Sequence, residues 1–255
     1  MQLYLSATHH ETLDALKHCR SLAHAAYRIG PGSTLLRQNM LLSVQGGLLS
    51  VSDEAAPFID DPDALCAAAV RECSRRGYDG VLLNFKSSTT QDRLTFAARL
   101  EPTLRGMGRR VYLPEHYAEA VPGAMVLIET ALSGGSLTEH LQEAAAKWGS
   151  NRLVLDIERV RMLFPLPCPS GVGTPLNYAE FQALTEQESP SVFFSPDLCA
   201  RYFTCHHKGS TQFVLFDDAE TLKRKVQIGR ECGAAAAILR WAEITDIAEA
   251  FFAQN

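Results

Sequence analysis

Short apolar runs alternate along most of this chain with longer segments in which apolar residues recur at helical spacing. In one such unit, residues 63–76 predict a helix, Gly77 predicts a turn and residues 80–83 predict a buried strand. The polar residues Asn84 and Lys86 follow that strand. A helix, a tight turn and a buried parallel strand with polar residues at its carboxyl end are typical of an α/β barrel, whose functional sites lie at that end of its strands.

The same reasoning predicts most of the chain after residue 60. The expected helices are 63–76, 90–105, 139–148 and one that opens at Asp217 and Asp218 and ends near Gly233; the expected strands are 110–114, 124–130, 152–158 and 234–239. Acidic or hydroxyl residues precede several of these helices, where a side-chain oxygen can accept a hydrogen bond from the first turn.

The first fifty residues predict fewer elements than a full barrel has. We expect a strand over 3–6 and a helix over 11–27, in which His18 and His24 are solvated. This leaves room for at most a stub of a second strand, so the front half of the barrel is expected to be trimmed. Residues 40–47 predict the third strand, or alternatively the first arm of a hairpin with residues 48–51.

Composition and charge narrow the class of protein. The chain has 255 residues, of which 46% are hydrophobic and 21% charged, as is usual for a single globular domain over residues 1–255. A net charge of -5 gives no reason to expect nucleic acid or an anionic membrane as a partner. No apolar run is long enough to span a bilayer, and residues 1–5 lack the features of a signal peptide, so we expect a cytoplasmic location.

The seven cysteines contain no C-x-x-C pair, which favours reduced, buried thiols. A zinc site from Cys199, Cys205, His206 and His207 is conceivable, but adjacent histidines point to opposite sides of a strand and the spacing fits no common ligand pattern. We therefore expect no metal and no cofactor.

Two stretches resemble family 18 glycoside hydrolases, the family of chitinases and spore cortex-lytic enzymes. Their signature strand reads D-G-x-D-x-D-x-E, and residues 79–86 read DGVLLNFK, so Asp79 and Gly80 match while Lys86 stands in place of the glutamate. Residues 216–222, FDDAETL, resemble a helix opening of the spore-germination branch. The resemblance implies a (β/α)8 TIM barrel, with a small antiparallel insertion at about residues 191–216 before the last helix and strand.

In that family the glutamate protonates the glycosidic oxygen and the substrate's own acetamido group attacks the anomeric carbon. Lys86 cannot act as that acid, and Asn84, in place of an inner aspartate, does not titrate. The tyrosine and aspartate that orient the acetamido group correspond to Thr130 and Ala131. The tryptophan that ends the last strand corresponds to Arg240, with Trp241 one residue later and so on the other side of the strand.

Polar residues at predicted strand ends are the candidates for a site. The proposed ligand-binding residues are Asn84, Lys86, Glu129, Asp156, Glu158 and Arg240, and the candidate catalytic acids, if the protein is active, are Glu129, Asp156 and Glu158. The favoured interpretation of the acids is an ion-pair network around a buried Lys86, with Arg240 also bridging to an acid. The alternatives are a new acid pair, or a site for a charged ligand such as muramic acid. His116 and Tyr202 are further candidates, although an ordinary loop or insertion residue is the favoured interpretation of each.

Three functional hypotheses remain. The first is a catalytically inactive barrel that binds an amino-sugar or peptidoglycan fragment, or acts as a scaffold, in a spore-forming bacterium. The second is a glycosidase acting on N-acetylglucosamine-containing polymers with reassigned acids. The third, a fully active family 18 hydrolase, rests on fold analogy alone. The loss of the acid at Lys86 favours a protein that is not an enzyme, and the sequence does not specify the oligomeric state.

Overall fold

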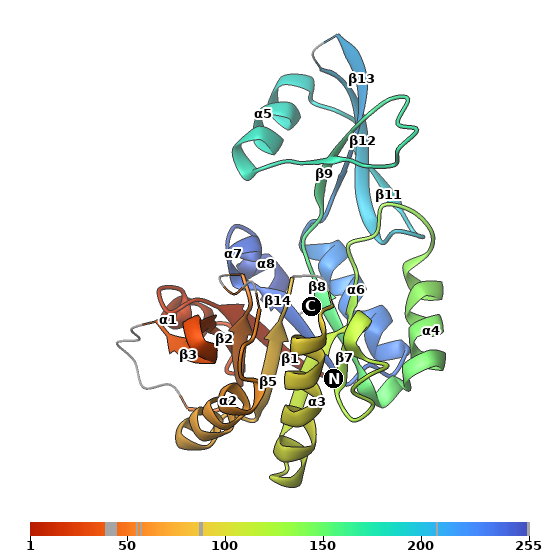
Figure 1. Ribbon diagram of the computed structural model, residues 1–255. Helices are drawn as coiled ribbons and strands as arrows, with labels where there is room; N and C mark the ends of the chain where they lie inside the picture. The colour runs from red at the N-terminus through yellow and green to blue at the C-terminus, as the bar shows by residue number, and fades with distance from the viewer. Residues whose placement is uncertain (39–44, 55, 57, 87–88, 208, 254–255) are drawn as a thin grey trace.

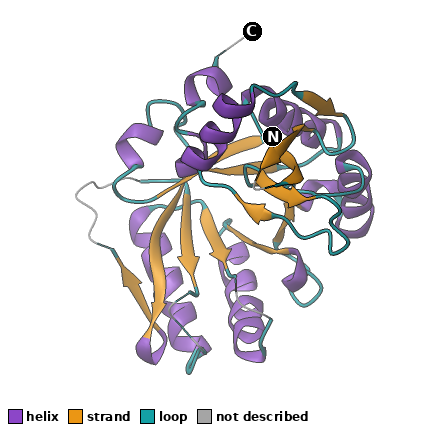
Figure 2. Ribbon diagram, turned by 90° about the horizontal axis from the view of Figure 1, so that it is seen from above, coloured by secondary structure: helices purple, strands orange, loops and turns teal. Residues whose placement is uncertain are grey.

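Eight parallel strands close into a ring in the computed structural model, which describes residues 1–38, 45–54, 56, 58–86, 89–207 and 209–253. The ring strands are β1 (Gln2–Ala7), β2 (Leu22–Gly30), β4 (Leu48–Ser52), β5 (Gly80–Asn84), β6 (Arg110–Pro114), β7 (Met125–Glu129), β8 (Leu153–Ile157) and β14 (Ala236–Arg240). Strand β1 pairs with both β14 and β2, which closes the ring seen from above in Figure 2. The predicted TIM barrel is confirmed.

Alternate side chains of each ring strand point into the barrel. The lower interior is filled by Tyr4, Ala23, Leu48, Leu82, Tyr112, Met125, Leu127, Val154, Ala236 and Ile238. A larger apolar core lies between the outside of the ring and the surrounding helices. Among the described residues, the barrel interior is therefore packed below its carboxyl-terminal end, which leaves that end for a ligand.

Helices cover the outside of the ring, and several begin after the acidic or hydroxyl capping residues that the sequence predicts. The helices are α1 (Thr12–Ala15), α2 (Pro62–Arg76), α3 (Gln91–Gly106), α4 (Leu137–Trp148), α6 (Ala219–Glu231), α7 (Trp241–Ile244) and α8 (Ala248–Phe252), with 3-10 turns at Pro31–Ser33, Glu115–Tyr117 and Ser150–Arg152. Side chains of Asp61, Ser136 and Asp218 accept hydrogen bonds from the first turns of α2, α4 and α6. Nowhere in the described ranges is a helix both long and apolar enough to cross a membrane.

The predicted helix over 11–27 is wrong beyond its first turn. It is the four-residue α1 followed by the complete strand β2, and a further strand, β3 (Thr34–Arg37), pairs antiparallel with β2 outside the ring. A barrel strand is buried on both faces, so its apolar residues form a nearly continuous run that also fits helical spacing. His24 lies on this strand and is buried rather than solvated, and burial lowers its pKa to about 4.

The third ring strand also lies later than predicted. It is β4, the run that the hairpin alternative had assigned to a second arm, whereas residues 40–44 of the predicted strand lie outside the described residues. The expected trimming of the second strand to a stub is wrong, because β2 is complete. The helical layer of the front half is short: α1 is a single turn, and the described residues between β2 and β4 contain no α-helix. All eight ring strands are present.

A second sheet rises above the barrel between β8 and α6 (Figure 1). It has the order β10-β9-β13-β12-β11, with β9 (Arg161–Pro165), β10 (Thr174–Pro175), β11 (Phe193–Ser195), β12 (Ala200–His207), β13 (Ser210–Phe216) and the helix α5 (Tyr178–Glu188) against it. The antiparallel insertion expected at about 191–216 extends further towards the N-terminus, because β9 pairs with β13 along its whole length.

A buried aspartate fastens both ends of this insertion to the barrel. Asp217 accepts hydrogen bonds from the backbone N–H of Val160 at 2.9 Å, from the Thr221 hydroxyl at 2.9 Å and from Lys225 Nζ at 2.7 Å. The backbone N–H of Asp217 in turn donates to the Val160 carbonyl at 2.8 Å. Val160 directly precedes the first strand of the insertion, and Asp217 directly follows its last strand. This cluster therefore fixes the insertion above the mouth of the barrel.

We predict that Lys225→Met lowers the free energy of unfolding by about 3 to 5 kcal/mol, because it leaves the buried Asp217 carboxylate without its cation. Both side chains of this pair are 0% exposed. Chemical denaturation measures the change. The matched control is Lys223→Met on the same helix, which removes a surface pair with Glu220 and should cost less than about 1 kcal/mol. Equal costs for the two variants would contradict the assignment.

Candidate functional site

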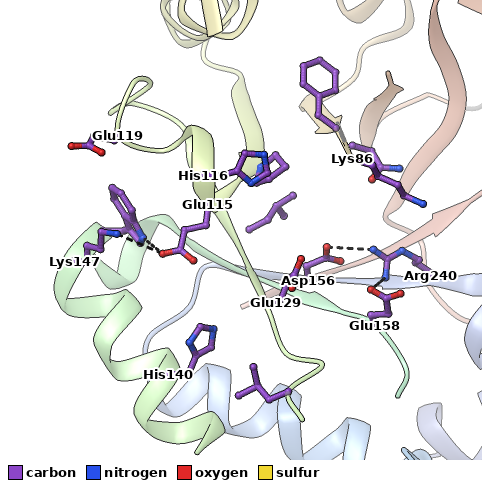
Figure 3. A pocket seen from close by; sticks show the side chains of 16 residues that line it. Lys86, Glu115, His116, Glu119, Glu129, His140, Lys147, Asp156, Glu158 and Arg240 are labelled. Atoms are coloured by element: carbon purple, nitrogen blue, oxygen red, sulfur yellow. Dashed lines mark hydrogen bonds and ion pairs between the residues drawn. The ribbon is translucent and has the colours of Figure 1, made fainter. Parts of the chain in front are cut away.

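A cavity of about 750 Å³ opens at the carboxyl ends of β5, β6, β7, β8 and β14. All six ligand-binding residues predicted from the sequence line it: Asn84, Lys86, Glu129, Asp156, Glu158 and Arg240. Figure 3 shows Glu129 beside Asp156, with Arg240 on the far side of Asp156 and Glu115 with Lys147 on the opposite wall. Ring closure has thus brought residues from four separate strands to one opening.

Strand β5 directs Asn84 and Lys86 towards this opening. Leu82 lies in the barrel interior and Asn84, two residues on, lies half-buried above it, whereas Phe85 points outwards into the outer core. The Lys86 side chain is 62% exposed, and its Nζ lies 3.3 Å from Glu54 Oε1 at the rim. The expected buried network around Lys86 is therefore wrong: the strand has ended, and the amine reaches water instead of the acids on the floor.

The two residues that match the signature, Asp79 and Gly80, have a structural role. The Gly47 N–H donates to Asp79 Oδ2 at 2.9 Å, and the Asp79 N–H donates to the Gly47 carbonyl at 2.7 Å. A Cβ on Gly80 would lie 2.2 Å from the Arg110 carbonyl oxygen, so only glycine allows β5 and β6 to approach this closely. Both residues lie at the amino end of β5, away from the mouth.

Arg240 is the cation that holds the acids of the floor. Its Nη2 lies 3.4 Å from Asp156 Oδ2, and its Nη1 lies 3.3 Å from Glu158 Oε2 and 3.6 Å from Glu243 Oε1. This confirms the predicted salt bridge of Arg240. Trp241 points the other way and is only 2% exposed in the outer core, so it provides no aromatic floor for the cavity.

The floor carries more negative than positive charge. Burial raises the pKa of Asp156, and the neighbouring Glu158 and Glu129 raise it further, while Arg240 offsets only part of this effect. Burial also raises the pKa of Glu243. For Arg240, burial alone would lower the pKa, but the surrounding carboxylates raise it overall. Burial and the repulsion between neighbouring carboxylates thus raise the pKa of the two acids, and the attraction of these carboxylates raises the pKa of Arg240.

Glu129 is the least constrained acid of the floor. It ends β7, lies directly beside Asp156 in the strand register, and is exposed to the cavity. Among the described residues, its carboxylate makes no hydrogen bond or ion pair. The next residue, Thr130, is fully buried and donates to the Asp156 carbonyl, so it does not replace the tyrosine that the resemblance would place here.

The wall opposite Arg240 was largely missed by the sequence analysis. It comes from Glu115, His116 and Glu119 after β6 and from His140, Lys147 and Trp148 on α4. The Trp148 indole N–H donates to Glu115 Oε1 at 2.9 Å, and Lys147 Nζ lies 3.9 Å from the same oxygen. The spacing of His140, Lys147 and Trp148 places them on one helix face, which was the available signal.

Of the two further candidates from the sequence, one lies at the cavity and the other does not. His116 does line the cavity, whereas Tyr202 does not line it and instead stacks on Phe193 and Phe213 in the insertion. In the described part of the chain, no three His, Cys, Asp or Glu side chains gather closely enough to hold a metal ion, and no disulfide links the cysteines. Two of the residues considered for a zinc site, Cys199 and Cys205, belong to different apolar clusters and so do not form one site.

Solved structures share this fold at low sequence identity. The spore cortex-lytic enzyme SleL of Bacillus megaterium QM B1551 has a TM-score of 0.68 and 13% identity, over 96% of this chain and 73% of SleL. A chitinase of Chromobacterium violaceum ATCC 12472 has a TM-score of 0.70 and 14% identity, over 100% of this chain and 99% of the chitinase. The GH18 chitinase of Cycas revoluta, solved with (GlcNAc)3, has a TM-score of 0.67 and 14% identity, over 99% of this chain and 97% of that one.

No protein-family model matches the sequence, and no curated protein matches it. The structural likeness nevertheless shows that the chain has the fold of the GH18 chitinases and of the spore cortex-lytic enzymes, as the signature strand had suggested. At identities of 13 to 14%, the likeness extends to the fold and leaves the chemistry of the mouth to be argued from its own residues.

We predict that Asp156→Asn gains stability relative to the wild type as the pH rises above 4. A carboxyl whose pKa is raised on folding holds its proton more tightly in the folded state, so its ionisation opposes folding once the pH exceeds its unfolded pKa. The asparagine does not ionise. The gain should be about 1.4 kcal/mol for each unit by which the pKa is raised, and it should level off above the folded pKa.

Chemical denaturation of both proteins at several pH values between 4 and 8 provides the test. Glu143→Gln, on the exposed side of α4, is the control, and its difference from the wild type should vary little with pH. A wild type that instead gains stability over Asp156→Asn as the pH rises would show that Arg240 outweighs burial.

Proposed function

We propose that this protein binds amino-sugar oligomers or peptidoglycan fragments in the mouth of its barrel and does not cleave them by the family 18 mechanism. The observation that carries the proposal is the position of Lys86. It follows the strand tip where the resemblance places the proton donor, and its amine lies at the solvent-exposed rim, paired with Glu54.

The chemistry of the family needs a carboxylic acid at that strand tip, because the same group must first donate and then accept a proton. Lys86 has no acceptor, and the nearby Asn84 does not ionise. The acids that do line the cavity belong to other strands, and Asp156 and Glu158 are engaged by Arg240. Changing Lys86 alone to glutamate would therefore not rebuild the catalytic arrangement.

Several features favour retained binding. A cavity of about 750 Å³ lies within the range of roughly 300–1,000 Å³ that small-molecule sites occupy. Carboxylates on its floor can accept hydrogen bonds from sugar hydroxyl and amide groups, and Trp148 adds an aromatic side chain to its wall. The Cycas revoluta chitinase of the same fold was solved with a GlcNAc trimer. These features support an amino-sugar ligand.

The charge distribution limits how a peptidoglycan fragment can lie. Because Arg240 is the one guanidinium beside the floor carboxylates of Glu129, Asp156 and Glu158, the carboxylate of a muramic acid unit would be repelled there. Lys86 at the rim is a cation that could receive it. We therefore expect a ligand to place hydroxyl and amide groups on the floor and any carboxylate at the rim. The likeness to SleL is the basis for a role in a spore-forming bacterium.

The second candidate is a glycosidase with reassigned acids. The observation that favours it is the neighbouring pair Glu129 and Asp156: two carboxylates on adjacent strands, one of them with a raised pKa. Such a pair could in principle divide the roles of acid and base, with Glu158 as a third acid nearby. Against it stands Arg240, which engages both Asp156 and Glu158.

The test is to measure turnover and binding on the same preparation. We predict no release of fluorophore from a fluorogenic N-acetylglucosamine oligomer, and saturable binding of tri-N-acetylchitotriose or a muropeptide by calorimetry. Glu129→Gln should weaken that binding by about three- to thirtyfold, because one exposed hydrogen-bond acceptor of the floor loses its charge. The control Glu143→Gln lies outside the cavity and should bind as the wild type does.

Turnover that disappears in Glu129→Gln but persists in Glu143→Gln would overturn the proposal in favour of the second candidate. Absence of both turnover and binding would leave the scaffold hypothesis as the better account of the fold.

A further inference from the structure

A second pocket, of about 350 Å³, lies on the side of the barrel between β3 and α2. It is lined by Tyr27, Leu35, Arg37, Ala68, Arg71, Glu72 and Arg75, none of which lines the mouth cavity. In Figure 1, β3 and α2 lie next to each other at the outer edge of the ring. The pocket is therefore separate from the proposed sugar site.

The extra strand β3 creates this pocket. It pairs antiparallel with β2 outside the ring, with Arg37 directly opposite Tyr27, and Leu35 lies on the same face as Arg37. On α2, Ala68, residues 71–72 and Arg75 recur at helical spacing and so face β3 together. A strand carrying one arginine and a helix carrying two thus form the opposing walls.

One acid lies among these arginines, and its charge is already neutralised. Glu72 accepts hydrogen bonds from Arg75 at 2.9 and 2.6 Å and from Arg76 Nε at 2.9 Å. The Tyr27 hydroxyl also donates to it at 3.0 Å. Burial alone would raise the pKa of Glu72, but these donors lower it overall, so the carboxylate is ionised and saturated.

Arg37 and Arg71 are left without an acid. Within the described ranges, neither guanidinium forms an ion pair, and the Nε of Arg37 is buried with no hydrogen-bond partner. Arg37 and Arg71 both line the pocket, so an anion there would supply the counter-charge that both guanidinium groups lack. The whole chain has a net charge of -5, so this local excess of arginine stands out against an acidic background.

We propose that this pocket binds a phosphoryl group carried by a small molecule, held between the guanidinium groups of Arg37 and Arg71 with support from Arg75. The planar donor fork of arginine matches the oxygens of a phosphate, which can accept from several guanidinium groups at once. A volume of about 350 Å³ suits a small phosphorylated compound. Leu35 and Ala68 provide apolar wall for the rest of such a molecule.

Inorganic pyrophosphate is the probe, titrated into the full-length protein by calorimetry at fixed ionic strength. We expect saturable binding that weakens at least tenfold in Arg37→Ala and in Arg71→Ala. Arg37→Lys keeps the charge but loses the fork, and should fall between the wild type and Arg37→Ala. The matched control is Arg230→Ala, an exposed arginine on α6 that lies outside the pocket and should leave the affinity unchanged.

Arg71 is exposed, so its variant keeps the test meaningful even if Arg37→Ala disturbs the fold. Affinities that are equal in the wild type, Arg71→Ala and Arg230→Ala would show an adventitious ion only and overturn the proposal. Malonate that binds as tightly as pyrophosphate, with the same dependence on Arg37 and Arg71, would overturn the phosphoryl assignment in favour of a dicarboxylate.

Discussion

Closure of the eight-stranded ring is the constraint on which the rest of this molecule depends. Once β1 hydrogen-bonds to both β14 and β2, successive residues of every strand must alternate between the interior and the outer core. This alternation directs Arg240 into the mouth and Trp241 into the outer core, one residue apart. Likewise, Asn84 ends β5 at the cavity and the next residue, Phe85, packs in the outer core. The chemistry of the mouth thus follows from strand register.

Within that register, the mouth contains a network of charged side chains. Arg240 lies within ion-pair distance of three carboxylates, and Lys86 reaches the rim. Meanwhile Asp79 and Gly80, the matching half of the signature, join β5 to its neighbours at the opposite end of the strand. A barrel can keep the residues that hold its strands together while the residues at the carboxyl ends change, because these two sets lie at opposite ends of the sheet.

Much of this arrangement could be predicted from local sequence. Helices with clear caps, such as α2 after Asp61 and α6 after Asp218, and the short apolar strands between them, were located to within a few residues. The six predicted residues of the mouth were found because the carboxyl ends of barrel strands converge, whatever the loop lengths.

The failures have physical causes. Strand β2 is buried on both faces and its run of apolar residues fits a helix equally well, so periodicity could not decide. The direction of Lys86 depended on where β5 ends, which sequence does not fix to within one residue. The wall opposite Arg240, which includes Trp148, depends on how α4 packs against the ring. Helical spacing shows which residues share a face of α4 but not where that face points.

The most direct test of the central claim, binding without cleavage, is a crystal structure of the protein after prolonged incubation with tri-N-acetylchitotriose. The account predicts an intact trisaccharide in the mouth, with hydroxyl or amide groups against Glu129 and Asp156. A shortened sugar in the same cavity, with an acid of the floor next to the broken linkage, would contradict it.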